Sequence, residues 1–326
     1  MLRGWWLGCV PRWQRVVEAV AGPSPVDKEV AAYVNALAAR AKQIRLPELF
    51  RGEQPRAFYQ RRDRHGASTI AIAQRYLSDS AVEAVLRFRL ANALLYKHVD
   101  PVPMFERRAE CEWWFSGSPD DILFFVGSSR TGEIACHSAL AYLGGPLAGR
   151  TLRSADRELF ETEQVFGRDV FLSLPIVPDL PLARLVESRR LVKTYWLDPL
   201  DELAFRAPME LGVASFHAMA GQLGATVDVV LGDITEEAER NLTFFSTAFV
   251  TLPRPLPPTD QLPVFHQEVE GTLSAPWAML VSDVPGAAAR VAAIEAALEL
   301  AGRDSLRALL ALRATTAPRR ATALQP

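Results

Sequence analysis

Residues 181–196 read PLARLVESRRLVKTYW and predict a strand with charged residues at its centre. Successive side chains of a strand point to opposite faces, so Glu187 and Arg189 are expected on one face and Ser188 and Arg190 on the other. A carboxylate beside a guanidinium stays ionised. Glu187 is therefore a candidate catalytic group that accepts a proton or holds an amine, and Arg189 a candidate ligand for a substrate carboxylate. The alternative is a cross-strand ion pair on a solvated face.

Downstream of this strand, helices and strands alternate. Residues 206–225 predict a helix ended by Gly224, and TVDVVLGDI (226–234) predicts a buried strand. A helix opened by Thr235 follows, with acidic residues in its first turn. Two strands, at 264–271 and 277–284, are then expected before a helix that has Pro285 at its start.

Upstream, TIAIAQ (69–74) predicts a strand and Ser78-Asp79-Ser80 a cap for the helix 81–96. Residues 122–143 predict a hairpin closed by a Ser-Ser-Arg-Thr-Gly turn. Residues 100–120 are expected to be loop, and so is the basic run 51–66. Together these elements indicate an α/β fold with a mixed sheet and helices on both faces, rather than the strict alternation of a doubly wound parallel fold.

Composition limits the classes of function. The chain has 326 residues and a net charge of -2, which gives no overall field to recruit nucleic acid or an anionic membrane. The three cysteines are too few and too scattered for a disulfide framework or a zinc site. No H-x-x-x-H or C-x-x-C spacing indicates a metal. No apolar run is long enough for a secretory or membrane-spanning segment, so a cytoplasmic protein without stable membrane insertion is expected.

Three segments carry a resemblance to a known family. TIAIAQ with SAVEAVLRFRLANALLY (69–74 and 80–96), LVESRRLV (185–192) and ERNLTFFSTAF (239–249) are similar to elements of the GNAT acyltransferases. Within that superfamily, they resemble the branch of autoinducer synthases and long-chain N-acyl amino acid synthases. The resemblance implies a mostly antiparallel central sheet in which the fourth and fifth strands, here 185–192 and 226–234, splay apart.

The family resemblance also implies a function. Such a protein transfers an acyl group from acyl-CoA or from the phosphopantetheine arm of an acyl carrier protein to a small-molecule primary amine, without a metal. The unpaired backbone of the splayed strands binds the arm, and a backbone N–H supports the oxyanion. By the same analogy Arg89, on the first helix, lies near the acceptor or the arm, and Trp113 lines an acyl-chain pocket. The alternatives are that Arg89 is solvent-exposed and that Trp113 packs against the domain.

The sequence departs from the family where the phosphates are bound. The usual Gln/Arg-x-x-Gly-x-Gly/Ala loop is missing, and Arg206-Ala-Pro-Met-Glu-Leu-Gly212 stands in its place. Arg206 and Gly212, expected at a helix N-terminus, remain candidate ligands for a phosphopantetheine phosphate. This departure keeps open a GNAT-like domain that binds a thioester without turnover. A methyltransferase is a further alternative, because VDVVLGDI resembles an adenosine-binding strand, although no Gly-x-Gly turn precedes it.

The expected organisation is a helical and basic extension at 1–66, a GNAT-like domain at 67–284, a C-terminal helix at 285–313 packed on that domain, and a disordered tail at 314–326.

Overall fold

One sheet of eight strands organises the described part of the chain, with the order β1-β2-β3-β4-β5-β6-β8-β7. The computed structural model describes residues 25–50, 56–112, 117–143, 148–198, 201–252, 275–300 and 302–315. Every neighbouring pair is antiparallel except β5 and β6, which are parallel. The strands are β1 (Ala57–Arg62), β2 (Ala67–Ala73), β3 (Ile122–Ser128), β4 (Ile134–Ala141), β5 (Leu185–Lys193), β6 (Val229–Ile234), β7 (Val250–Thr251) and β8 (Ala275–Leu280).

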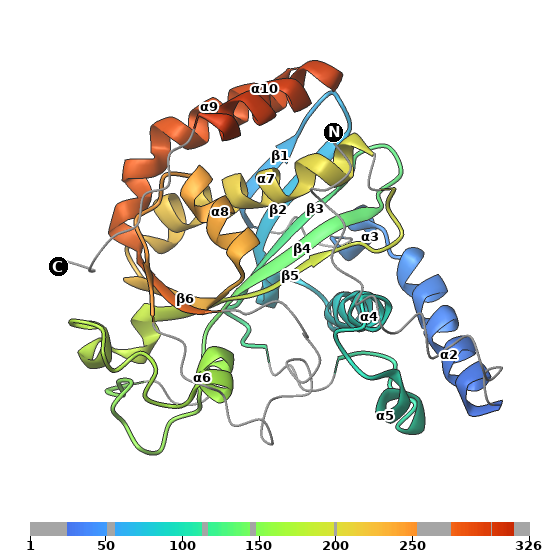
Figure 1. Cartoon of the computed structure of the whole chain (residues 1–326), viewed down its shortest axis with the longest axis horizontal. Helices are drawn as coiled ribbons and strands as arrows, with labels where there is room; N and C mark the ends of the chain where they lie inside the picture. Colours follow the sequence, from blue (N-terminus) through green and yellow to red (C-terminus); the bar gives the residue numbers. More distant parts are fainter. Residues whose placement is uncertain are drawn as a thin grey trace.

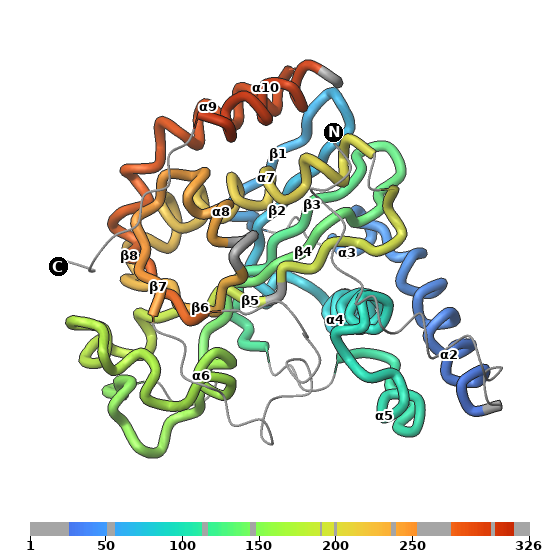
Figure 2. The backbone as a smooth tube through the Cα atoms, in the orientation of Figure 1, coloured from blue at the N-terminus to red at the C-terminus, as the bar shows by residue number. Residues whose placement is uncertain are grey.

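Helices cover both faces of the sheet (Figure 1). On one face α7 (Glu202–His217) packs on β2, β3 and β4, and α9 (Ala288–Glu299) and α10 (Gly302–Ala314) pack against α7. On this side, α8 (Glu236–Phe244) contacts β6. On the other face α4 (Asp79–Leu95) contacts β5, and α2 (Pro25–Lys42), α3 (Leu46–Leu49) and α5 (Pro101–Glu106) surround it (Figure 2). The short α6 (Glu161–Phe166) lies beside β6.

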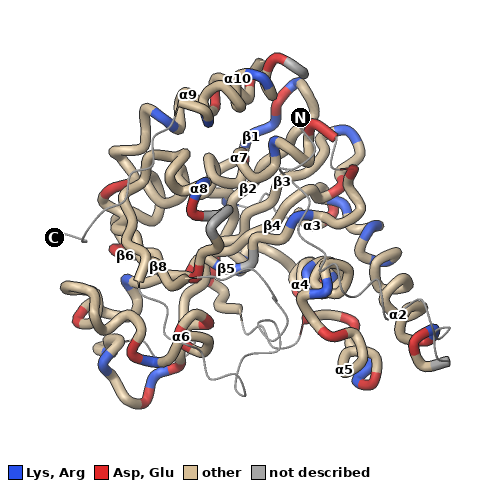
Figure 3. Tube along the Cα trace, in the orientation of Figure 1, with Lys and Arg blue, Asp and Glu red and all other residues tan. Residues whose placement is uncertain are grey.

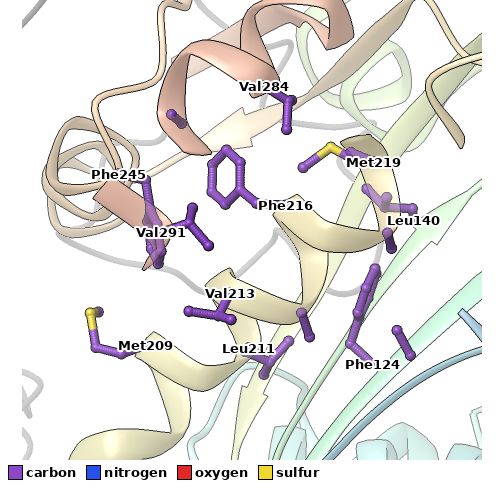
Figure 4. Packing of buried hydrophobic residues seen from close by; sticks show 14 of the residues in the cluster. Phe124, Leu140, Met209, Leu211, Val213, Phe216, Met219, Phe245, Val284 and Val291 are labelled. Atoms are coloured by element: carbon purple, nitrogen blue, oxygen red, sulfur yellow. The ribbon is translucent and has the colours of Figure 1, made fainter. Parts of the chain in front are cut away.

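The core lies mainly between the sheet and α7. Phe124 and Leu140 of the sheet face Phe216 and Met219 of the helical layer, and Val284 packs beside these helical residues (Figure 4). On the opposite face, Leu123 and Phe125 pack with apolar residues of α4. Adjacent residues of β3 thus enter different cores, as strand alternation requires.

Most predicted elements are confirmed, including the strands β2 and β6, the 122–143 hairpin and α4 with its Ser78 cap, whose Oγ accepts the N–H of Ala81 at 3.2 Å. The expected loops are partly wrong: residues 57–62 of the basic run form the edge strand β1, and residues 101–106 form α5. The basic strand is tolerated because Arg61 pairs with Glu299 at 2.8 Å. Near the C-terminal end, α10 follows α9 as a second helix. The predicted strand 264–271 lies outside the described residues.

Candidate active site at the β5 bulge

Strand β5 changes its pairing halfway along. On one side, Arg189 stands opposite Ala139 of β4 and Val192 opposite His137, so β5 carries one extra residue between these pairs. On the other side, β5 pairs with β6 only from Leu185–Glu187, and its partners there are Val229–Leu231. A bulge leaves a residue unpaired and bends its strand. Beyond Glu187, β5 and β6 no longer pair, at the place where the family resemblance implies that the two strands splay apart.

Gly232 marks the last close approach of the two strands. A Cβ on this residue would stand 3.2 Å from the carbonyl oxygen of Ser188 and 2.9 Å from Nε1 of Trp277. A side chain at position 232 would therefore press on Trp277 and on the β5 backbone. This glycine belongs to the VVLGDI segment, whose apolar pattern does not indicate such a contact.

Two rows of side chains cross the sheet next to the bulge, on the α4 face. Glu187 pairs with Ala141 and Arg189 with Ala139. Asp121 directly precedes β3 and extends the first row, because Ile122 is opposite Leu140. Directly opposite residues share a face. Asp121 and Glu187 thus flank Ala141, with Arg189 in the neighbouring row, and charged residues gather where β5 passes α6 (Figure 3).

Glu187 and Arg189 lie on one face, as predicted, but that face is buried. The Glu187 side chain is 1% exposed and accepts Nε of Arg189 at 2.5 Å. Its carboxylate also accepts the N–H of Glu161 at 3.0 Å and of Thr162 at 2.6 Å. These are the first two residues of α6, so Glu187 supplies acceptors that the helix start lacks. The alternative of an ion pair on a solvated face is wrong.

Asp121 is the acidic residue that sequence reasoning missed. It is fully buried, and its carboxylate accepts the N–H of Tyr142 at 2.9 Å and of Ser118 at 3.1 Å. Burial raises its pKa to about 6, although the two N–H groups and the charges of Arg189 and Arg89 act in the other direction. A carboxyl group with such a pKa exchanges a proton near neutral pH. The only sequence signal was its place between a Ser-Pro-Asp turn and an apolar strand.

Arg89 is buried between α4 and the sheet. Its side chain is 2% exposed and pairs with Glu112 at 2.7 Å. The alternative of a solvent-exposed Arg89 is wrong. Arg87, two residues before it, pairs instead with Glu83 along the same helix at 2.6 Å. Trp113 lies outside the described residues.

His137 and Cys136 point to opposite sides of β4, as adjacent strand residues must. The His137 ring stacks on Phe125, and its Nδ1 lies 2.9 Å from the carbonyl oxygen of Phe124. Burial, with the nearby charge of Arg89, lowers its pKa to about 3. His137 is therefore neutral, and it forms no nucleophile pair with Cys136.

Arg206 does not lie at a helix start, where the phosphate site was expected. α7 begins at Glu202, so Arg206 lies inside the helix rather than before it. Its guanidinium is 2% exposed and bonds to Asp63, to Glu210 and to the carbonyl oxygen of Leu298. Two acids already compensate the charge of Arg206. Through these bonds, Arg206 holds α7, the Asp63 turn and α9 together. The sequence prediction failed because it placed the helix start four residues too late.

Gly212 also has a packing role. It lies well inside α7, where a Cβ would overlap the ring of Phe245. Phe245 stacks on Phe216 with ring centroids 4.8 Å apart. The glycine lets the residue after α8 reach the core beside α7, and it is not at a helix N-terminus.

Among the described residues, no three His, Cys, Asp or Glu side chains are grouped as metal ligands would be. None of the described helices is both long and apolar enough to cross a membrane.

Among known proteins, similarity to this chain is found in solved structures. No family model matches the chain, and no curated protein sequence matches it. TofI, in a ternary complex with an inhibitor and MTA, is 13% identical, with a TM-score of 0.37 over 67% of this chain and 95% of that one. FeeM, an N-acyl amino acid synthase from uncultured soil microbes, is 10% identical, with a TM-score of 0.39 over 70% and 95%.

A third similar structure is BjaI, a CoA-dependent acyl-homoserine lactone synthase with SAM and isopentyl-CoA. It is 14% identical, with a TM-score of 0.35 over 68% of this chain and 88% of that one. Because these TM-scores lie below 0.5, the assignment of the fold rests on strand order and register. A mostly antiparallel sheet, one parallel pair that separates at a bulge and helices on both faces make this fold GNAT-like.

Proposed function

We propose that this protein transfers an acyl group from the thioester of a phosphopantetheine arm, on CoA or on an acyl carrier protein, to a primary amine. The observation that carries the proposal is the end of the β5–β6 pairing at Glu187 and Leu231, while β5 continues to Lys193. Backbone N–H and C=O groups require partners. An extended thioester arm between the two strands supplies partners to both.

Charge near the bulge favours an amine as acceptor. Four carboxyl groups meet there: Glu187, Glu161 and Asp121 around Arg189, and Glu112 on Arg89. Two guanidinium groups oppose them, so these six side chains carry more negative than positive charge. A cationic acceptor is attracted to such a cluster. In this proposal Glu187 orients Arg189, and Arg189 and Arg89 contact the acceptor or the thioester.

A binding domain without turnover is the second candidate. It is supported by the full engagement of Glu187 in structural contacts and by the absence of the expected Arg206–Gly212 cradle at the start of α7. A methyltransferase is not supported, because β6 lies between a parallel and an antiparallel neighbour rather than in a doubly wound sheet.

The test incubates purified protein with acyl-CoA and acyl-carrier-protein thioesters and a mixture of amines, and follows thiol release and product mass. An acyltransferase gives new amides that require both substrates. Glu187→Gln is expected to reduce the rate, whereas Glu83→Gln, which removes the exposed partner of Arg87, is not. Thioester binding without any amide supports the binding domain. If no thioester binds, the proposed function is wrong.

A further inference from the structure

We propose that Asp121 accepts the proton of the acceptor amine, and that Glu187 is a positioning residue rather than the base. This inference rests on the proposed function and names the residue that would serve it. It follows from the placement of the two carboxyl groups in one row across β3, β4 and β5, on either side of Ala141.

Between the two acids, the row carries only small side chains on β4. Ala141 separates the two acids, and Ala139 stands opposite Arg189 in the neighbouring row. Only methyl groups therefore project from β4 between Asp121 and the bulge of β5. Side chains directly opposite on neighbouring strands are about 5 Å apart at Cβ. Ala141 is itself covered, so an amine that displaced this covering would have Asp121 on one side and the β5 backbone on the other.

Most hydrogen-bond acceptor sites of Glu187 are already occupied. Its two oxygens accept three donors, and one donor is the charged guanidinium of Arg189 at 2.5 Å. Each oxygen of Asp121 accepts one backbone N–H. Asp121 thus keeps acceptor sites on both oxygens, as a base requires.

The surroundings of Asp121 support the same assignment. Its carboxyl group is fully buried, and burial raises its pKa to about 6. The charged and titratable groups around it are Arg189 and Glu187 on β5, Arg89 on α4 with its partner Glu112, Glu161 on α6, the neighbouring Asp120, and Tyr142 after β4. The two arginines favour its charged form and burial opposes it, so it is a carboxylate above about pH 6 and takes up a proton readily.

The step balances within the two substrates. The amine nitrogen forms a C–N bond with the thioester carbonyl carbon as its proton passes to Asp121. The C–S bond then breaks, and the leaving thiolate takes the proton back from Asp121. The products are an amide and a free thiol, and the carboxylate is regenerated.

The experiment measures amide formation by Asp121→Asn, Asp120→Asn and wild type from pH 5 to 8, with rates expressed per free amine. Asp120→Asn is the matched control, because this neighbouring acid is exposed and pairs with Arg75 at 2.5 Å. Wild type and Asp120→Asn should lose kcat below about pH 6. Asp121→Asn should lower kcat by about 10²–10⁴-fold, as expected for loss of a general base, and leave KM nearly unchanged. The fall in kcat below about pH 6, the acidic limb of the profile, should disappear in this variant.

Three results bear on the proposal separately. If wild type forms amide and Asp121→Asn keeps both kcat and the acidic limb, the assignment of Asp121 is wrong while the proposed function stands. If wild type forms no amide, the proposed function itself fails. If Asp121→Asn does not fold, Asp121→Glu gives the reading: a lowered kcat with a retained limb supports the proposal, and wild-type kcat overturns it.

Discussion

The carboxylate of Glu187 accepts the backbone N–H of Thr162 at 2.6 Å, and this contact joins the centre of β5 to the start of α6. The same carboxylate holds Arg189, whose Nε also lies 3.8 Å from Glu161 of that helix. The charged residues at the bulge therefore fasten the polypeptide around α6 to the sheet.

Glu187→Ala should lower the free energy of unfolding by about 3 kcal/mol, because it leaves the partly buried guanidinium of Arg189 without its nearest carboxylate and two N–H groups of α6 without acceptors. Urea denaturation measures the change. Glu83→Ala, at an exposed ion pair, should change stability by about 1 kcal/mol or less. Equal effects of the two substitutions would show that the contacts of Glu187 contribute nothing.

Gly212→Ala should destabilise the protein by about 1–3 kcal/mol through overlap with the Phe245 ring. Adding Phe245→Leu should recover part of that loss, because it removes the ring that the methyl group meets. Gly286→Ala is the control, since a Cβ there meets nothing within 4 Å. A loss of thioester binding at Gly212→Ala with unchanged stability would instead favour the phosphate role.

Arg206→Met should lower the free energy of unfolding by about 3 kcal/mol, because it removes the guanidinium bonded to the buried Asp63 and Glu210 and leaves them only Arg61. Arg153→Met, at an exposed pair with Asp179, provides the comparison in a thermal or urea unfolding experiment. A stable Arg206→Met protein that has lost only thioester affinity would contradict the structural role.

Asp121→Asn should have a larger free energy of unfolding than wild type at pH 7.5. The difference between the two proteins should be smaller at pH 4. A carboxyl group with a folded pKa of about 6, above its ordinary 3.8, loses stabilising free energy as pH rises through this window. The gain is expected on the order of 1–3 kcal/mol. Urea unfolding at the two pH values measures it. A variant that is less stable at pH 7.5 would show that the charged form of Asp121 stabilises the fold.

Periodicity and capping residues predicted most of the fold. The order of apolar strands and the Ser78 cap placed β2, α4 and the 122–143 hairpin, because these elements depend on local pattern. The strand β1 was missed because its arginines are neutralised by residues far along the chain, such as Glu299.

The candidate site was predicted less completely. Alternation placed Glu187 and Arg189 on one face. It gave no information on burial, which depends on α6, or on Asp121, which reaches the same row only through the pairing of β3 with β4. Arg206 and Gly212 were misplaced because the start of α7 is set by the Asp201 cap, which accepts the N–H of Leu203 at 2.7 Å.

Backbone hydrogen–deuterium exchange with a non-reactive thioether analogue of acyl-CoA tests the central claim most directly. The amides of residues 188–193 and 232–234, where β5 and β6 no longer pair, should become protected when the analogue binds, because the thioester arm would pair with them. Protection confined to other elements, or binding that leaves both strands unchanged, would contradict the claim that this separation holds the acyl donor.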